Sequence, residues 1–222
     1  MNLALPLQHY PTHRERAADA WVHGIGLTLA ALGGLVLLVW SILDGAPGEI
    51  GAVAIYALCW LAMLTASAFY NFHENSTRQP LLRRLDHAAI FLMIAGTYTP
   101  FTTQRFEGAW ALGMTLAVWA LALAGVAGKL FLPGLSKRIW IALYLGLGWL
   151  ALVALDPFIR GVSPIALGLI VAGGLIYSVG VVFYMIKALP YRRAIWHGAV
   201  VGASGTHYAA VLVGVLLPAP LA

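Results

Sequence analysis

Seven long runs of apolar residues divide the chain, and they constrain its fold more than any other feature. A helix that crosses a bilayer needs about 20 apolar residues in succession. Backbone groups in lipid must be hydrogen-bonded within their own segment, so such runs predict helices. The predicted spans are residues 21–42, 50–70, 87–103, 109–131, 140–155, 165–186 and 196–217. The third and fifth are short, and we expect flanking residues to complete them.

The composition supports a membrane protein. Hydrophobic residues make up 61% of the 222 residues and charged residues only 9%, whereas soluble domains carry about 25% charged residues. The short connections between spans leave no room for a second domain. We therefore predict an all-α, seven-transmembrane bundle over residues 21–217, preceded by a cytoplasmic tail (1–20) and followed by a short C-terminal tail (218–222).

The basic residues are distributed unevenly across this predicted topology. Eleven of the 13 Lys and Arg fall on the side of the N-terminus, leaving Arg105 and Arg160 on the other side. The positive-inside rule then predicts a cytoplasmic N-terminus and an external C-terminus, in a multi-pass protein of the bacterial inner membrane. We expect the basic residues to meet anionic membrane lipids, and no nucleic-acid-binding motif is found.

Polar residues gather at the cytoplasmic ends of several predicted spans. Odd-numbered spans begin at this side and even-numbered spans end there, so one membrane level holds His23, Ser67, Asn71, His73, Asp86, His87 and His197. Asp19 lies four residues before His23, on the same helical face. Ser204 shares a face with His197, whereas His207 lies about 15 Å deeper in the last helix. For His207 we expect a hydrogen bond to another helix.

Ionisable residues inside a membrane are costly and often functional. Three interpretations of this level remain open from residue types alone. The imidazoles, with a Ser and an Asp, would suit a zinc ion that activates water. The same groups would also suit a proton relay. In the third interpretation they form a polar network that holds the bundle together without chemistry.

Four motifs resemble the bacterial hemolysin III family, which is grouped with the progestin and adipoQ receptors and, more distantly, the alkaline ceramidases. They are E-x-x-x-D-x-x-x-H-G-I-G from Glu15, S-A-F-Y-N from Ser67, R-R-L-D-H-A-A-I-F-L-M-I-A-G-T-Y-T-P-F from Arg83, and R-R-A-I-W-H from Arg192 with a further His at position 207. The resemblance implies seven helices, a cytoplasmic N-terminus and a zinc site near the cytoplasmic side. Ser67, Asp86 and His197 match family positions of that site, and His207 matches a deeper family His.

Two positions depart from the family's zinc site. Asn71 stands where the resemblance implies the first histidine ligand, and Arg193 where it implies the first His of an H-x-x-x-H pair. Asn is a poor zinc ligand, and Arg does not lose its proton. The inherited site is therefore expected to be degenerate, unless His73 or His87 supplies a replacement nitrogen. Alternatively, Arg193 pairs with Asp86 and replaces the charge of the metal.

Three functions follow as hypotheses. The first is a role in membrane homeostasis, with a cytoplasm-facing polar pocket that binds a lipid. This hypothesis needs no metal, so it agrees best with the two substituted ligand positions. The second is a zinc-dependent lipid amidase in which Ser67 or Asp86 orients the attacking water and His197 binds zinc. The third is a pore-forming protein, as the family's hemolysin name implies. An oligomer remains open in each case.

Overall fold

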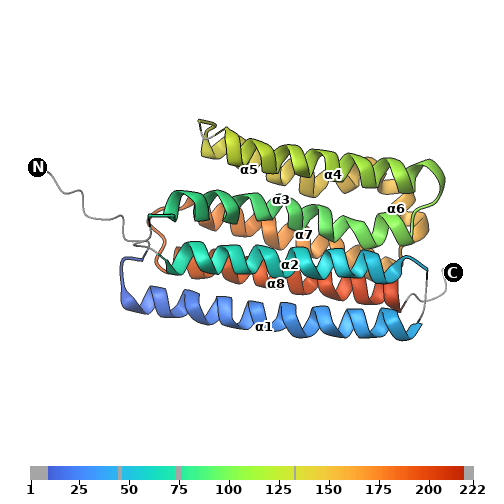
Figure 1. The fold of residues 1–222 in the computed structure, drawn as a ribbon, viewed down its shortest axis with the longest axis horizontal. Coiled ribbons are helices and arrows are strands. Elements are labelled where there is room, and N and C mark those ends of the chain that lie inside the picture. Colours follow the sequence, from blue (N-terminus) through green and yellow to red (C-terminus); the bar gives the residue numbers. More distant parts are fainter. Residues whose placement is uncertain (1–9, 45–46, 74–76, 133, 218–222) are drawn as a thin grey trace, which may run out of the picture.

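The computed structural model describes residues 10–44, 47–73, 77–132 and 134–217, and these residues form a bundle of roughly parallel and antiparallel helices (Figure 1). The α-helices are α1 (His13–Asp44), α2 (Glu49–Phe72), α3 (Gln79–Gln104), α4 (Gly108–Phe131), α5 (Lys137–Gly148), α6 (Leu155–Gly161), α7 (Pro164–Met185) and α8 (Arg192–Val211). A 3-10 segment, η1 (Trp149–Ala154), joins α5 to α6, and a π-helical turn, η2 (Leu212–Leu216), extends α8. The predicted C-terminal tail and the first nine residues lie outside the described part.

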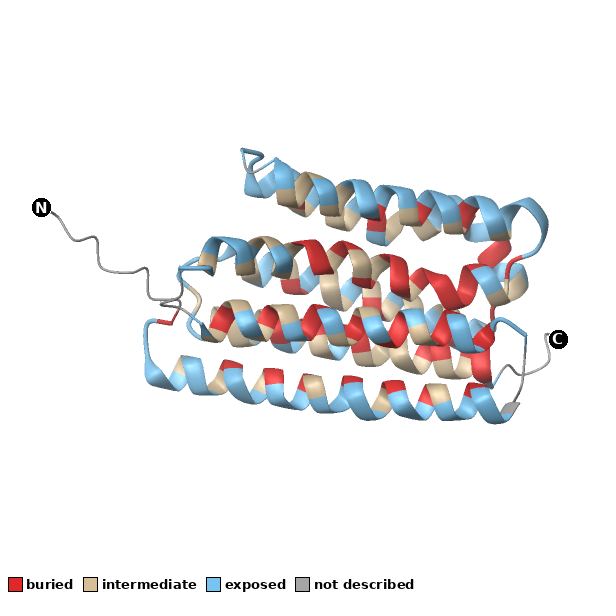
Figure 2. Ribbon diagram, in the orientation of Figure 1, coloured by how far each residue is buried: buried red, intermediate tan, exposed pale blue. Residues whose placement is uncertain are grey.

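Six helical segments are long and apolar enough to cross a membrane: α1, α2, α4, the continuous α5–η1–α6 segment, α7, and α8 with η2. The remaining predicted span corresponds to α3, which has 26 residues but carries charged groups in its first turns. Helix α3 packs against both α2 and α4, and much of its surface is buried (Figure 2). A helix covered by its neighbours needs less apolar surface towards lipid, which explains its lower hydropathy.

Both predicted short spans are longer in the structure. Helix α3 begins at Gln79, eight residues before the predicted start of the third span. The fifth span continues through η1 to Gly161. At the transition from α5 to η1, the Tyr98 hydroxyl accepts a hydrogen bond from Ala151 N at 2.7 Å and donates to Gly148 O at 2.8 Å. This side chain from α3 satisfies backbone groups that the loosened helix leaves unpaired.

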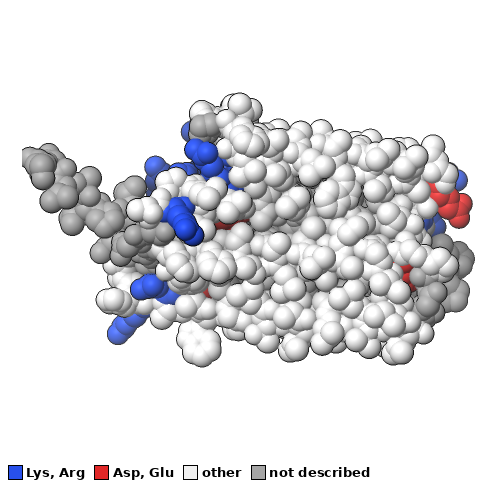
Figure 3. All heavy atoms as spheres, in the orientation of Figure 1, with Lys and Arg blue, Asp and Glu red and all other residues white. Residues whose placement is uncertain are grey.

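The charged residues separate along the bundle axis. Figure 3 shows Lys and Arg gathered at the end where the described chain begins. We call this the basic end; the helix ends that meet there, and the connections between them, carry Arg14, Arg16, Arg78, Arg83, Arg84, Lys129, Lys137, Arg138, Lys187, Arg192 and Arg193. Arg105 and Arg160 lie at the opposite end. The distribution predicted from the sequence is therefore present in three dimensions.

Glycines allow the helices to approach closely, as expected for a membrane bundle. A Cβ atom added at Gly125 in α4 would lie 2.6 Å from the ring of Phe91, which is buried in α3. In α7, a Cβ atom at Gly173 would overlap the ring of His207. By contrast, Gly113 in α4 has no atom within 4 Å of such a position. Gly125 is thus a packing position, whereas Gly113 faces open space.

We therefore expect Gly125→Ala to destabilise the protein and Gly113→Ala to leave it unchanged or slightly stabilised. Overpacking a well-packed contact costs about 1–3 kcal/mol, and an alanine is the better helix former at an open site. Thermal unfolding of the two variants in the same detergent measures the difference. Equal unfolding temperatures would show that α3 and α4 do not pack as described.

Candidate functional site: a buried polar cluster beside a cavity

The carboxylate of Asp19 lies at the centre of a buried polar cluster. Asp19, in the second turn of α1, has no exposed surface. Its Oδ2 accepts a hydrogen bond from the Tyr10 hydroxyl. Its Oδ1 lies 2.6 Å from Nδ1 of His197, in the second turn of α8. The carboxylate therefore joins the residues that precede α1 to both α1 and α8.

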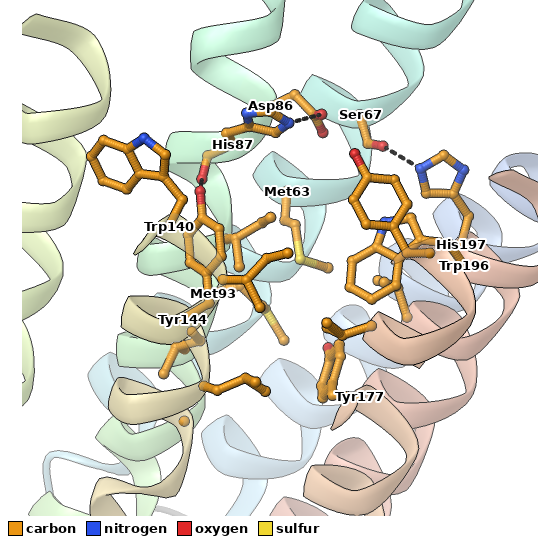
Figure 4. Close-up of a pocket in the computed structure, with 18 of the residues that line it drawn as sticks. Met63, Ser67, Asp86, His87, Met93, Trp140, Tyr144, Tyr177, Trp196 and His197 are labelled. Carbon is orange, nitrogen blue, oxygen red and sulfur yellow. Dashed lines mark hydrogen bonds and ion pairs between the residues drawn. The ribbon is translucent and has the colours of Figure 1, made fainter. Parts of the chain in front are cut away.

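Two imidazoles converge on one serine hydroxyl. His23 places its Nδ1 2.9 Å from the backbone oxygen of Asp19 and its Nε2 3.2 Å from Ser67 Oγ. The Nε2 of His197 lies 3.4 Å from the same Oγ, and a dashed line marks this contact in Figure 4. The two rings meet edge to face, with centroids 4.4 Å apart. Helices α1, α2 and α8 each contribute one of these three side chains.

The hydrogen-bond partners of the two histidines indicate which ring nitrogens carry protons. Each Nδ1 faces an oxygen of Asp19 that can only accept, so each ring is assigned a proton at Nδ1 and a lone pair at Nε2. The hydroxyl of Ser67 has one proton and can donate to only one of these lone pairs. At least one Nε2 lone pair therefore receives no proton from Ser67 and is available to a metal cation.

Three residues of this cluster lie close enough together that they could hold a metal ion. One ligand atom each from Asp19, His23 and His197 lies within 4.8 Å of the others, and all three residues are buried. Histidines that bind metals usually donate the proton of their second ring nitrogen to a carboxylate or a carbonyl. Both histidines make such a contact with Asp19 through Nδ1, which leaves the two Nε2 atoms as metal donors.

The two positions that depart from the family pattern contact each other. Arg193, in the first turn of α8, donates from a guanidinium nitrogen to Asn71 Oδ1 at 2.6 Å. The amide nitrogen of Asn71 donates in turn to the backbone oxygen of Ser67 at 2.9 Å and lies 3.3 Å from its Oγ. The substituted pair therefore forms one wall of the cluster and contacts the hydroxyl on which the imidazoles converge.

The other predicted residues lie in three different places. Asp86 and His87 line the same cavity from α3, with Asp86 Oδ2 3.9 Å from His87 Nε2 (Figure 4). His73 ends α2 on the exposed surface and donates to Phe69 O. The hydroxyl of Ser204 lies 2.7 Å from that of Tyr177.

His207 makes the interhelical hydrogen bond expected from the sequence. Its Nε2 lies 3.2 Å from Ile170 O in α7, so it donates to that carbonyl. This contact lies deeper in α8 than the Asp19 cluster.

Sequence reasoning did not identify Tyr10 as part of the site. This residue falls in the predicted polar tail, three residues before α1, yet its side chain is buried. Its ring stacks with Phe72 at a centroid distance of 6.2 Å, and the Arg193 guanidinium lies 5.7 Å from the ring centre. No periodicity marks a single aromatic residue in a tail, so its contact with Asp19 emerges only from the fold.

The cluster opens on a cavity of about 440 Å³. Apolar and aromatic side chains from α2, α3, α5, α7 and α8 form most of its walls, among them Met63, Met93, Trp140, Tyr144, Tyr177 and Trp196 (Figure 4). Ser67, Asn71 and His197 line the cavity on the side of the cluster. A cavity of this size and character suits a small ligand with a substantial apolar part.

The fold and this site define a multi-pass α-helical membrane protein with a buried polar cluster that opens on an apolar cavity. The family model for haemolysin-III related proteins matches residues 11–208. The chain is 32% identical over 201 residues to the hemolysin-3 homolog of Bacillus subtilis (strain 168), covering 90% of this chain and 94% of that protein. It is 34% identical over 206 residues to hemolysin-3 of Bacillus cereus, covering 91% and 93%.

A mammalian protein is also similar over most of its length. The monocyte to macrophage differentiation factor of Homo sapiens is 28% identical over 214 residues, covering 92% of this chain and 86% of that protein. The chain therefore belongs to the haemolysin-III related family, which confirms the resemblance seen in its motifs.

Replacing Asp19 should destabilise the bundle far more than replacing an exposed acid. Asp19→Ala removes the partner of two buried side chains, and hydrogen bonds to charged groups are worth about 1.5–3 kcal/mol each. Asp156→Ala is the matched control, because Asp156 pairs with Arg160 at 2.8 Å on the surface, where such pairs contribute about 0–1 kcal/mol. Thermal unfolding in detergent compares the two. Similar losses of thermal stability in the two variants would contradict the stabilising role of the buried Asp19 carboxylate.

Proposed function

We propose that this protein takes an amphiphile from the membrane into its cavity and hydrolyses an acyl bond in it, an amide or an ester, with the help of a metal ion. Such an activity would serve membrane homeostasis by altering the lipid composition. The proposal rests on one observation: two buried imidazoles, His23 and His197, lie together with the carboxylate of Asp19, and both imidazoles line an apolar cavity. The family's zinc site supports it, although its ligands here differ from the family pattern.

The two imidazole donors fit zinc, which commonly binds histidine nitrogen. In this proposal the Nε2 atoms of His23 and His197 hold the ion, and Asp19 orients both rings by accepting from their Nδ1 atoms. A zinc ion would act as a Lewis acid that polarises the carbonyl and makes water more nucleophilic at neutral pH. The second imidazole would thus come from α1, and neither His73 nor His87 is needed as a ligand.

The remaining residues would bind and orient the substrate. Ser67 presents a hydroxyl beside the two imidazoles, suited to hydrogen-bonding a polarised carbonyl, and Asn71 positions it from the other side. Asp86 lines the same cavity, where its carboxylate can accept a proton from the attacking water and return it to the leaving group. The apolar walls would exclude bulk water, which strengthens each of these electrostatic contacts.

A transmembrane pore has less support than hydrolysis. In the described part of the chain, Asp, Glu, Lys and Arg lie near the two ends of the bundle rather than along a path through it. A wide aqueous path needs polar groups throughout its length.

Metal content tests the proposal directly. We expect about one zinc ion per purified chain, as for a single site, and its loss in His23→Ala and in His197→Ala. His73→Ala should keep the metal, because His73 lies on the surface away from the cluster. Elemental mass spectrometry makes the measurement, on protein without residues 1–9 so that His9 does not contribute. Protein without stoichiometric metal would overturn metal-assisted hydrolysis.

We further propose seven spans, with α3 as the seventh, an N-terminus in the cytoplasm and a C-terminus outside, in a bacterial inner membrane. The basic end would then face the cytoplasm. Reporter fusions in bacterial cells test this topology: a fluorescent protein at the N-terminus should fluoresce, and alkaline phosphatase at the C-terminus should be active. Inactive C-terminal phosphatase with a fluorescent C-terminal fusion would indicate an even number of spans.

A further inference from the structure

Basic side chains from four helices converge on the mouth of the cavity. The residues that line it include Arg83, Arg84, Lys129, Lys137 and Arg193, which we call the cationic rim. They come from α3, α4, α5 and α8. Among the described residues that line the cavity, Asp86 is the single acidic one. The lining therefore carries a clear excess of positive charge.

Aromatic and backbone contacts position several members of the rim. The Lys129 ammonium lies 4.4 Å from the ring centre of Trp140, and that of Lys137 lies 3.7 Å from the ring centre of Tyr184. Both aromatic rings also line the cavity. Arg84 donates to Leu130 O at 3.1 Å. These contacts hold the cations beside the cavity. A general preference for basic residues at the cytoplasmic side does not account for such specific contacts.

The cavity becomes apolar beyond the rim. Met63, Met93, Ile94, Leu145 and Val181 contribute to its lining. A ligand that satisfies both regions needs an apolar chain for the interior and an anionic group for the mouth. Arg and Lys bind carboxylate and phosphate groups through charge-assisted hydrogen bonds, which are roughly twice as strong as neutral ones.

We infer that the ligand of this cavity is an anionic amphiphile: one apolar chain with a carboxylate or phosphate headgroup held by the cationic rim. This inference names the substrate class of the proposed hydrolysis and, for the reaction, rests on that proposal. Arg193 connects the two regions, since it belongs to the rim and donates to Asn71 beside Ser67. A headgroup bound at the rim would therefore keep a nearby acyl carbonyl within the part of the cavity lined by Ser67.

Native mass spectrometry in a neutral detergent tests the inference. The probes are oleate, a carboxylate; lysophosphatidylglycerol, an anionic phosphate ester; and lysophosphatidylcholine, which has no net charge. We expect one molecule of either anionic probe per chain and about tenfold weaker binding of lysophosphatidylcholine, the difference expected for losing roughly 1.4 kcal/mol of charge-assisted contact. A preference for oleate or for lysophosphatidylglycerol would distinguish the two headgroups. Equal affinity for all three probes would overturn the inference.

Paired variants separate the rim from the general charge of the basic end. Arg83→Gln combined with Lys129→Gln removes two rim cations and should weaken binding of the anionic probes about tenfold. Arg138→Gln combined with Lys187→Gln removes two exposed cations that do not line the cavity, and should leave binding unchanged. Equal losses of binding affinity in the two double variants would contradict a specific role for the cationic rim. Elution as a single peak in size-exclusion chromatography confirms that both proteins are folded.

Two further measurements distinguish the ligand and the reaction. Millimolar inorganic phosphate should leave the anionic probes bound. Displacement of the probes by phosphate alone would show that the rim binds a free anion, and would overturn the inference that the ligand is an amphiphile. Metal content and hydrolysis are measured on the same wild-type protein. Binding of oleate or lysophosphatidylglycerol by protein that holds no metal and hydrolyses nothing would support the inference and overturn the proposed function, so the two can fail separately.

Discussion

The polar cluster depends on the buried carboxylate of Asp19. A carboxylate removed from water inside an apolar bundle is costly unless charged or hydrogen-bonding partners compensate. Here the compensation comes from Tyr10, ahead of α1, and from His197 on α8. The contacts that stabilise this carboxylate also fix the orientation of the His197 ring and leave its Nε2 facing Ser67 Oγ. Packing of α1 against α8 and preparation of a metal donor therefore depend on the same interaction.

The substitutions at Asn71 and Arg193 are best understood as one coupled change. An arginine in the first turn of α8 would place a guanidinium against two imidazoles, which is unfavourable if either imidazole binds a cation. Asn71 accepts from that guanidinium at 2.6 Å and keeps it beside the cluster rather than within it. The family's ligand positions thus form a wall of the cluster. In the proposed metal site, His23 of α1 would take the place of a lost imidazole.

The sequence could predict the helices and the membrane level of the site, because lipid allows few backbone solutions and helix direction alternates. The bends of the helices, and the contacts among the side chains at that level, could not be predicted in the same way. Whether His23, His73 or His87 joins His197 depends on how each helix is rotated and which neighbour it packs against, and all three residues share one depth. The 3-10 segment after Gly148 depends on a side chain from another helix, Tyr98, and so has no local signature.

The charges of the site connect the two proposals. A divalent cation held by the Asp19 cluster, together with Arg193, brings more positive charge than the carboxylates of Asp19 and Asp86 can balance. The other cations of the rim add to this excess in surroundings where apolar walls weaken screening. An anionic headgroup would supply the missing negative charge, whereas a neutral lipid would leave it uncompensated. Metal and anionic amphiphile should therefore favour each other's binding, and a protein stripped of metal should bind the same anion more weakly.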